Sequence, residues 1–160
     1  MTGADSFPCS HRIDEEALRW LSAEYAAAVD RRDGQRFAAL FVPEGALVVP
    51  DYPHGLAPVV VRSGRRVLER IPDGLRNYRR TFHQTSDHRY TVDGDRASGD
   101  VRCVAHHVSG HADKSAVGTD TVWYLHYQDE YARTEAGWRF LRREIHLQFV
   151  EELPVVVVGD

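Results

Sequence analysis

Two long hairpin patterns in the second half of the chain limit the possible folds more than any other feature. Residues 83–92 and 96–108 both read as strands, and the Asp93-Gly94 dipeptide between them is a strong signal for a tight turn. The second pair of strand patterns spans residues 121–133 and 138–150, joined by "TEAG". Four long strands connected in this way predict an extended antiparallel sheet.

A long helical pattern comes before these strands. Between residues 13 and 30, the side chains of Leu18, Leu21 and Tyr25 recur at helical spacing, and alanines fill the adjacent stripe. Asp14 is the expected N-cap. This pattern predicts a broadly buried helix over residues 13–30.

Two shorter helices and two short strands complete the pattern. One helix follows Asp33-Gly34, and another is expected over residues 63–71, capped by Ser63 and ended by Pro72. The short strands carry the letters "ALVV" and "PVVV". Helices that precede an antiparallel sheet and cover one face of it define an α+β fold, here with six strands.

The chain is predicted to form one domain. A domain of 160 residues buries roughly 70% of the surface that its unfolded chain exposes, which leaves room for a core and a small-molecule cavity. Residues 1–12 are expected to be a loose tail and residues 13–150 the domain. Residues 151–160 form an apolar tail, expected to pack on the pocket mouth or on a neighbouring subunit.

Composition argues against several classes of partner. A net charge of −4 with scattered arginines predicts no binding to nucleic acid. The longest apolar run, "VVVV", is far too short to span a bilayer, so no membrane partner is expected. Cys9 and Cys103 lack motif spacing and are predicted to be reduced thiols of a cytoplasmic protein.

The segment "CVAHHVSGH" places three histidines within six positions. Apolar and polar residues alternate along this strand. If the apolar set faces the helices, so does His107, whereas His106 points the other way and His111 falls in the following loop. His106 and His111 are therefore expected to be solvated polar residues, and no metal site is predicted.

Four residues are predicted to meet in one pocket as the catalytic set. His83 opens one strand and His107 ends the next, at similar distances from the hairpin turn, so antiparallel pairing brings them together. Asp30 ends the first helix, where the negative end of the helix dipole is expected to make it more basic. Tyr25 lies five residues earlier on the same helix and can offer its hydroxyl to that cavity.

Further residues are predicted to bind substrate. Asp87 shares strand parity with His83, and Tyr52 lies in a proline-rich loop at the expected mouth. Tyr127 and Arg143 on the last hairpin are expected to line the wall, unless a bulge reverses their parity.

The order of these segments resembles the SnoaL-like branch of the nuclear-transport-factor-2-like (NTF2-like) superfamily. The likeness runs from about residue 13 to residue 150 and is carried by "EYAAAVDRRDGQRFAALF", "TFHQTSDHRYTVDGDRASGDVRCVAHH" and "YQDEYARTEAGWRFLRRE". It implies a cone-shaped α+β barrel, in which a curved, mostly antiparallel six-stranded sheet wraps around the N-terminal helices. A deep pocket is then expected at the open end.

Within this superfamily the polar pattern is similar to that of scytalone dehydratase and the bile-acid dehydratases. The resemblance gives Asp30 the place of their catalytic aspartate and His83 that of their strand histidine. His107 is similar in placement to the second histidine of scytalone dehydratase, and Tyr25 matches the helix tyrosine of the bile-acid enzymes. Scytalone dehydratase has a tyrosine where this chain has Val29, so the substrate is not carried over.

These observations predict a cofactor-independent lyase or isomerase that acts on a cyclic hydroxylated or carbonyl-bearing small molecule, as in secondary metabolism. In this mechanism His83, held by Asp30, takes a proton next to a carbonyl while Tyr25 stabilises the enolate oxygen. His107 then protonates the departing hydroxyl. No organic cofactor and no metal is required.

Two alternatives stay open, and an assembly is expected. The same pocket suits polyketide cyclisation or epoxide hydrolysis, and the same fold serves as a non-catalytic binding or structural subunit. A homodimer or homotrimer is expected through the outer face of the sheet. That face is predicted to carry Val104, His106, Val108 and Trp123.

Overall fold

The computed structural model describes residues 9–110 and 117–156 of the chain. Its helices are α1 (Cys9–Asp30), α2 (Gly34–Ala39), α3 (Arg65–Leu68) and the 3₁₀ helix η1 (Pro72–Leu75). Its strands are β1 (Phe41–Pro50), β2 (Pro58–Ser63), β3 (Arg80–Asp93), β4 (Arg96–Ser109), β5 (Gly118–Thr134) and β6 (Gly137–Val155). The predicted order of helices and strands is confirmed, and with it the α+β class.

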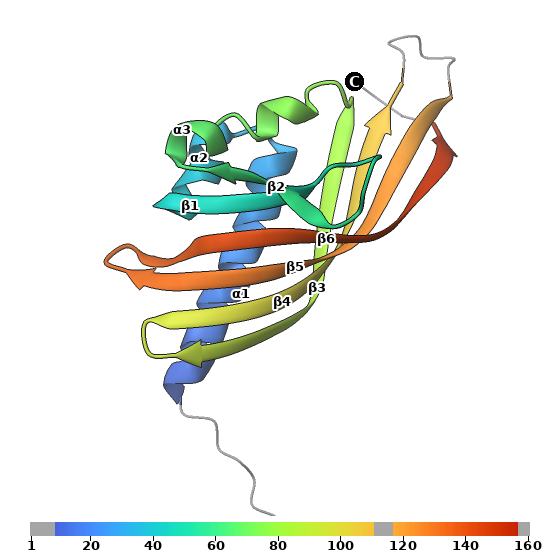
Figure 1. The fold of residues 1–160 in the computed structure, drawn as a ribbon. Coiled ribbons are helices and arrows are strands. Elements are labelled where there is room, and N and C mark those ends of the chain that lie inside the picture. The colour runs from blue at the N-terminus through green and yellow to red at the C-terminus, as the bar shows by residue number, and fades with distance from the viewer. Residues whose placement is uncertain (1–8, 111–116, 157–160) are drawn as a thin grey trace, which may run out of the picture.

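The strands form one sheet in the order β2-β1-β6-β5-β4-β3. Neighbouring strands are antiparallel except β1 and β6, which pair in parallel. Figure 1 shows the long strands curving around α1, while α2, α3 and η1 gather near one end of that helix. The sheet is open, with β2 and β3 as its edges, and its curvature creates the concave side on which α1 lies.

The helix α1 begins at Cys9 rather than at residue 13, and the predicted N-cap Asp14 lies inside it. Only 8% of Asp14 is exposed. Its carboxylate accepts two hydrogen bonds at 2.8 Å from Arg133 and one at 3.0 Å from Trp138 Nε1. Asp14 therefore fastens α1 to the β5–β6 hairpin, a role that a local capping rule cannot reveal.

Other helix and strand boundaries also differ from the prediction. The helix α2 begins at Gly34, and Asp33 is its N-cap, accepting a hydrogen bond from the Arg36 backbone N–H at 3.0 Å. The N-cap of α3 is Gly64, at φ +82°, because Ser63 is still the last residue of β2. The strand β6 continues to Val155 by pairing with β5, so residues 151–155 belong to the sheet rather than to a tail.

The inner face of the sheet follows the predicted parity. On β4 the side chains of Val101, Cys103, Ala105 and His107 are all buried. Trp123, predicted on the outer face, is instead on this inner side, because it pairs directly with Ala105 across β4 and β5. Cys103 is a free buried thiol. None of the helices in the described part of the chain is long and apolar enough to cross a membrane.

Candidate active site

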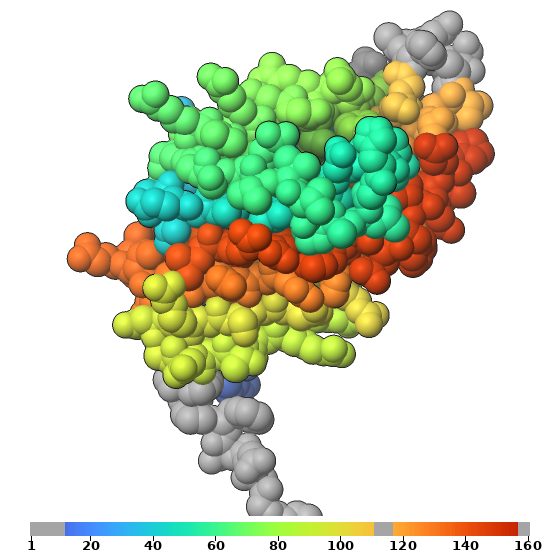
Figure 2. Space-filling view, viewed as in Figure 1, coloured from blue at the N-terminus to red at the C-terminus, as the bar shows by residue number. Residues whose placement is uncertain are grey.

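A largely apolar cavity of about 280 Å³ lies between α1, the inner face of the sheet and η1. Figure 2 shows the surface hollowed between the segment that follows β1 and the η1 region. Pro50, at the end of β1, and Leu75, at the end of η1, line the cavity. Its other polar or aromatic lining residues are Tyr25, Arg62, Tyr78, His83, His107, Trp123 and Tyr127.

Asp30 and His83 form a hydrogen-bonded dyad. His83 lines this cavity, whereas Asp30 lines an adjoining cavity that shares Tyr78 with it. The distance from His83 Nδ1 to Asp30 Oδ1 is 2.7 Å, and the His83 backbone N–H donates to Asp30 Oδ2 at 3.0 Å. With the carboxylate ionised, Nδ1 carries the ring proton and Nε2 keeps a lone pair. A histidine held in this way can accept a proton from a molecule in the cavity.

The protonation state of Asp30 supports this arrangement. Burial opposes the negative charge, but hydrogen bonds from the His83 ring and backbone, the charge of His83 and the Thr81 hydroxyl outweigh it. Together they hold the pKa of Asp30 below its usual value. The expectation that the helix terminus makes Asp30 more basic is therefore wrong, because direct hydrogen bonds are stronger than the dipole.

His107 lies beside the dyad, as the strand register predicts. Its ring centroid is 5.6 Å from that of His83, and the two rings are nearly perpendicular, at 86°. Burial and the nearby charge of His83 lower the pKa of His107 to about 4. The neutral ring donates from Nδ1 to the Thr121 carbonyl oxygen at 3.1 Å, which leaves Nε2 as a hydrogen-bond acceptor.

Tyr25 and Tyr127 form the floor of the cavity, with their ring centroids 5.6 Å apart. Burial raises the pKa of both phenols, so both stay protonated at neutral pH. The Arg143 guanidinium lies over both rings, 4.2 Å from the Tyr25 centroid and 3.9 Å from that of Tyr127. The arginine and the two phenols form one packed unit.

Three of the predicted substrate-binding residues do not line the cavity. Arg143 is fully buried and forms a bidentate ion pair with Asp129. Its guanidinium lies against the rings of Tyr25 and Tyr127, which line the cavity in its place. Asp87 is exposed, because β3 changes register between Ser86 and Arg89 and Asp87 takes a φ of +47° there. This bulge reverses the parity on which the prediction rested.

Tyr52 is the third of these residues, and it lies just outside the cavity. Its ring packs against Trp123, with centroids 5.3 Å apart, and 37% of the residue is exposed. Trp123 itself lines the cavity. Tyr52 can therefore act on a ligand only through Trp123 or at the rim.

Sequence reasoning missed two aromatic residues that enclose His107. The ring centroids of Tyr78 and Trp123 each lie 5.1 Å from that of His107. Trp123 alternates with Leu125 and Tyr127 along the same strand, and this alternation could have indicated that Trp123 faces inward. Tyr78 lies between η1 and β3, where the sequence has no periodicity to place it.

His106, the neighbour of His107 in the "CVAHHVSGH" segment, does not line the cavity. His106 is not simply solvated: its Nδ1 lies 2.6 Å from Asp120 Oδ2, and that carboxylate also accepts a 3.2 Å hydrogen bond from the His107 backbone N–H. His111 lies outside the described residues. Among residues 9–110 and 117–156, no group of three or more histidine, cysteine or acidic side chains is arranged to hold a metal ion.

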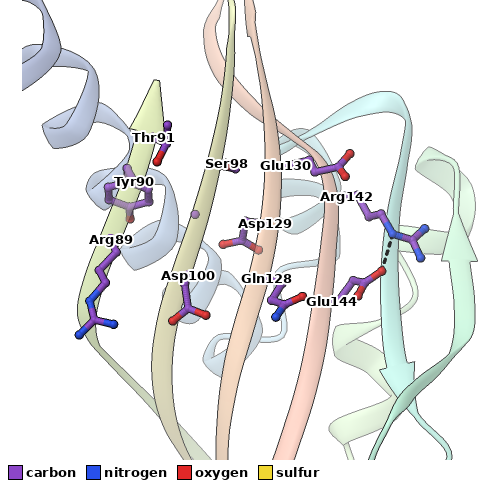
Figure 3. A pocket seen from close by; sticks show the side chains of 11 residues that line it. Arg89, Tyr90, Thr91, Ser98, Asp100, Gln128, Asp129, Glu130, Arg142 and Glu144 are labelled. Carbon is purple, nitrogen blue, oxygen red and sulfur yellow. Dashed lines mark hydrogen bonds and ion pairs between the residues drawn. The ribbon is translucent and has the colours of Figure 1, made fainter. Parts of the chain in front are cut away.

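A second, polar cavity of about 470 Å³ lies across β3, β4, β5 and β6 at a distance from the dyad. Figure 3 shows that charged and amide side chains border it, including Arg89, Asp100, Gln128 and Glu144. The pair formed by Arg142 and Glu144, at 2.7 Å, lies on its rim. It contains none of the predicted catalytic residues, so the apolar cavity is the candidate active site.

The curved sheet around one long helix, with a cavity between them that His83 lines, is an NTF2-like fold. The model of the SnoaL-like domain matches residues 10–144, and this chain belongs to that family. Protein Rv2910c of Mycobacterium tuberculosis, which is uncharacterized, is 28% identical over 132 residues. That match covers 81% of this chain and 82% of the relative.

Solved structures show the same fold. A candidate scytalone dehydratase from Novosphingobium aromaticivorans superposes with a TM-score of 0.75 at 19% identity, covering 93% of each chain. The hexachlorocyclohexane dehydrochlorinase LinA-type3 from Novosphingobium barchaimii gives a TM-score of 0.72 at 15% identity. That superposition covers 89% of this chain and 92% of the dehydrochlorinase. The predicted SnoaL-like and NTF2-like membership is confirmed.

Proposed function

We propose that this protein is a cofactor-independent lyase or isomerase, and that it removes water from a cyclic substrate bearing a hydroxyl group and a carbonyl. The observation that carries the proposal is the 2.7 Å contact of Asp30 with His83, a histidine that lines an apolar cavity. A histidine oriented by a carboxylate is an arrangement suited to proton abstraction. Structures that share the fold include a candidate scytalone dehydratase and a dehydrochlorinase, both named for eliminations.

In the proposed reaction His83 Nε2 takes the proton from the carbon next to the carbonyl. The electrons of that C–H bond form an enolate, and Tyr25 donates a hydrogen bond to its oxygen. The enolate then expels the hydroxyl group, which leaves as water after it accepts the proton that His83 now carries. The ring of His83 returns to its neutral state, so protons and electrons balance without a cofactor.

The environment of His107 changes the role that the sequence suggested for it. A residue with a pKa of about 4 carries no extra proton at neutral pH, and its Nδ1–H is already donated to the Thr121 carbonyl. We therefore assign His107 Nε2 as an acceptor that orients the substrate hydroxyl. His83 serves as both the base and the acid, which requires the proton and the hydroxyl to leave from the same side of the ring.

The size and lining of the cavity suggest the class of substrate. Its volume of about 280 Å³ is just below the range of small-molecule pockets, roughly 300–1,000 Å³. Aliphatic and aromatic side chains make up most of the lining. We expect a compact substrate of one or two rings, with its polar groups directed toward the two histidines.

The reaction is tested by offering the protein a panel of one- and two-ring β-hydroxy ketones in deuterated buffer. Ultraviolet absorbance would report formation of the conjugated enone, and proton NMR would report exchange at the carbon next to the carbonyl. We expect at least one ketone to react, and the Asp30→Asn and His83→Ala variants to lose that reaction. His54→Ala, at an exposed ion pair with Asp51, is the matched control and should keep it. Wild-type protein no faster than Asp30→Asn on every ketone that binds would contradict the proposal.

A homodimer or homotrimer stays a prediction. Large apolar side chains are exposed on Phe82, which is 58% accessible, and on Phe149, which is 53% accessible. The Phe149 ring stacks on Tyr124 with centroids 4.3 Å apart. We propose that this region is buried between copies of the chain, and light scattering that returns the 18.2 kDa monomer at micromolar concentration would contradict it.

A further inference from the structure

A second set of polar groups contacts the Asp30 carboxylate, beside its hydrogen bond to His83. The Thr81 hydroxyl lies 2.9 Å from Asp30 Oδ1, and Arg32 Nη1 lies 2.6 Å from the same hydroxyl oxygen. An arginine can only donate, and a hydroxyl has one proton to give. Thr81 must therefore accept a hydrogen bond from Arg32 and donate one to Asp30, so the direction of both hydrogen bonds is fixed.

The backbone around Arg32 is shaped to hold its side chain in this place. Arg32 has a φ of +59°, in the left-handed region that residues with a Cβ atom rarely adopt. Its guanidinium donates to the carbonyl oxygens of Val29 at 2.9 Å, Asp30 at 3.3 Å and Leu75 at 3.2 Å. The side chain thus turns back over the end of its own helix and ties it to η1.

Several charged groups surround the Asp30 carboxylate. Arg32, Arg76, Arg79 and Arg80 line a cavity of about 350 Å³ together with Asp30. The dyad partner His83, with His107 beside it, is the titratable neighbour of the same carboxylate. Arg76 is exposed and paired with Asp73 at 2.7 Å. Arg32 differs from Arg76 because it acts on the carboxylate through a directed hydrogen bond to Thr81.

We infer that Arg32 and Thr81 are positioning residues for the dyad: Arg32 orients the Thr81 hydroxyl, and that hydroxyl keeps the Asp30 carboxylate ionised and turned toward His83. This inference extends the proposed function, since its catalytic meaning depends on the dyad being the site of reaction. Its physical content is a property of the resting protein, and it can be measured without substrate.

The effect of losing either residue has a definite sign. A donated hydrogen bond and a nearby positive charge both favour the ionised carboxylate. The Thr81 hydrogen bond is among the causes that already hold the pKa of Asp30 below its usual value. Removal of the hydroxyl or of the guanidinium should therefore make Asp30 easier to protonate, and its titration should move to higher pH.

The test is a carbon-13 NMR titration of the aspartate side-chain carboxyls in the full chain. Thr81→Val removes the hydroxyl at nearly constant shape, Thr81→Ser keeps it, and Arg32→Met removes the charge while retaining an unbranched stem. Arg31→Met, at the exposed neighbouring position, is the control. We expect the Asp30 midpoint to rise in Thr81→Val and Arg32→Met, and to stay at the wild-type value in Thr81→Ser and Arg31→Met.

An unchanged Asp30 midpoint in both Thr81→Val and Arg32→Met would overturn the inference. If Thr81→Val fails to fold, Arg32→Met and Thr81→Ser still decide it, because the first should shift the midpoint and the second should not. On a ketone that the wild type converts, both disruptive variants should lower kcat by about ten- to a hundredfold while KM stays within about twofold. A shifted midpoint without turnover of any ketone contradicts only the proposed reaction, whereas turnover with unshifted midpoints contradicts only this inference.

Discussion

Two carboxylates on the inner side of the sheet each hold a cationic or titratable partner, but their surroundings differ. Asp129 is 3% exposed and receives two hydrogen bonds from Arg143, at 2.8 and 2.7 Å, and one from the Tyr131 hydroxyl at 2.6 Å. Asp30 is only half-buried and is bonded to His83, whose ring borders a cavity. The geometry of the closest contact is nearly the same in both pairs.

The difference between the pairs lies in what each partner can exchange. An arginine keeps its proton under all physiological conditions, so Asp129 and Arg143 can only attract one another and their neighbours. A histidine gains and loses a proton near neutral pH, and His83 has a second nitrogen for a ligand. The Asp129–Arg143 pair supports the tyrosine rings of the cavity floor, whereas the Asp30–His83 pair has a histidine that can transfer a proton.

The largest expected effect is a difference in the free energy of unfolding between variants of the two pairs. Asp129→Asn leaves the Arg143 charge buried without a counter-ion, and breaking a buried pair in this way costs about 3–5 kcal/mol. Urea denaturation should show this loss in the free energy of unfolding. The Asp30 side chain is 23% exposed and its partner is a histidine, so Asp30→Asn should lower that free energy by clearly less than Asp129→Asn does. Equal losses in the two variants would remove the distinction between the pairs.

A second expected effect concerns the two adjacent histidines on β4. His107→Ala removes a group that lines the cavity, and turnover should fall by about a hundredfold. His106 lies on the other face, where it pairs with Asp120, and His106→Ala should leave turnover within a few-fold. Steady-state rates on a converted ketone measure both. The reverse ranking would mean that the strand register does not define the site.

The smallest expected effect is a pH dependence of stability that His107 contributes. Burial and the His83 charge lower its folded pKa to about 4, whereas an unfolded histidine titrates near about 6.5. Between these values the unfolded chain binds more protons, so this contribution is complete above about pH 6.5 and is lost as the pH falls toward 4. The free energy of unfolding of His107→Gln should fall less steeply than that of the wild type between pH 7 and pH 5. Parallel curves would contradict the buried, neutral state of His107.

The sequence predicted those parts of the fold and site that depend on periodicity. The Asp93-Gly94 turn and the alternation along β4 correctly placed His83 and His107 on one face, with centroids 5.6 Å apart. Asp87 was misplaced because a single bulge reverses parity, and no residue in that strand signals the bulge. Arg143 was correctly predicted to face inward, but sequence gives no depth, so its position beneath the rings could not be foreseen.

The contacts between distant segments were also beyond the reach of the sequence. Arg32 and Thr81 are 49 residues apart, and their hydrogen bond depends on how α1, η1 and β3 meet in three dimensions. Asp14 and Arg133 are 119 residues apart. Local rules treat both aspartate and arginine at such positions as ordinary surface residues.

The most direct test of the Asp30–His83 dyad is a double-mutant cycle on turnover of a converted ketone. Asp30→Asn and His83→Ala should each lower kcat by about a thousandfold while both proteins stay folded. The double variant should be little worse than either single one, because groups that act as one unit are not additive. If the two losses instead multiply, so that the double variant falls by about a millionfold or to the uncatalysed rate, Asp30 and His83 act independently and the dyad is not the centre of the reaction.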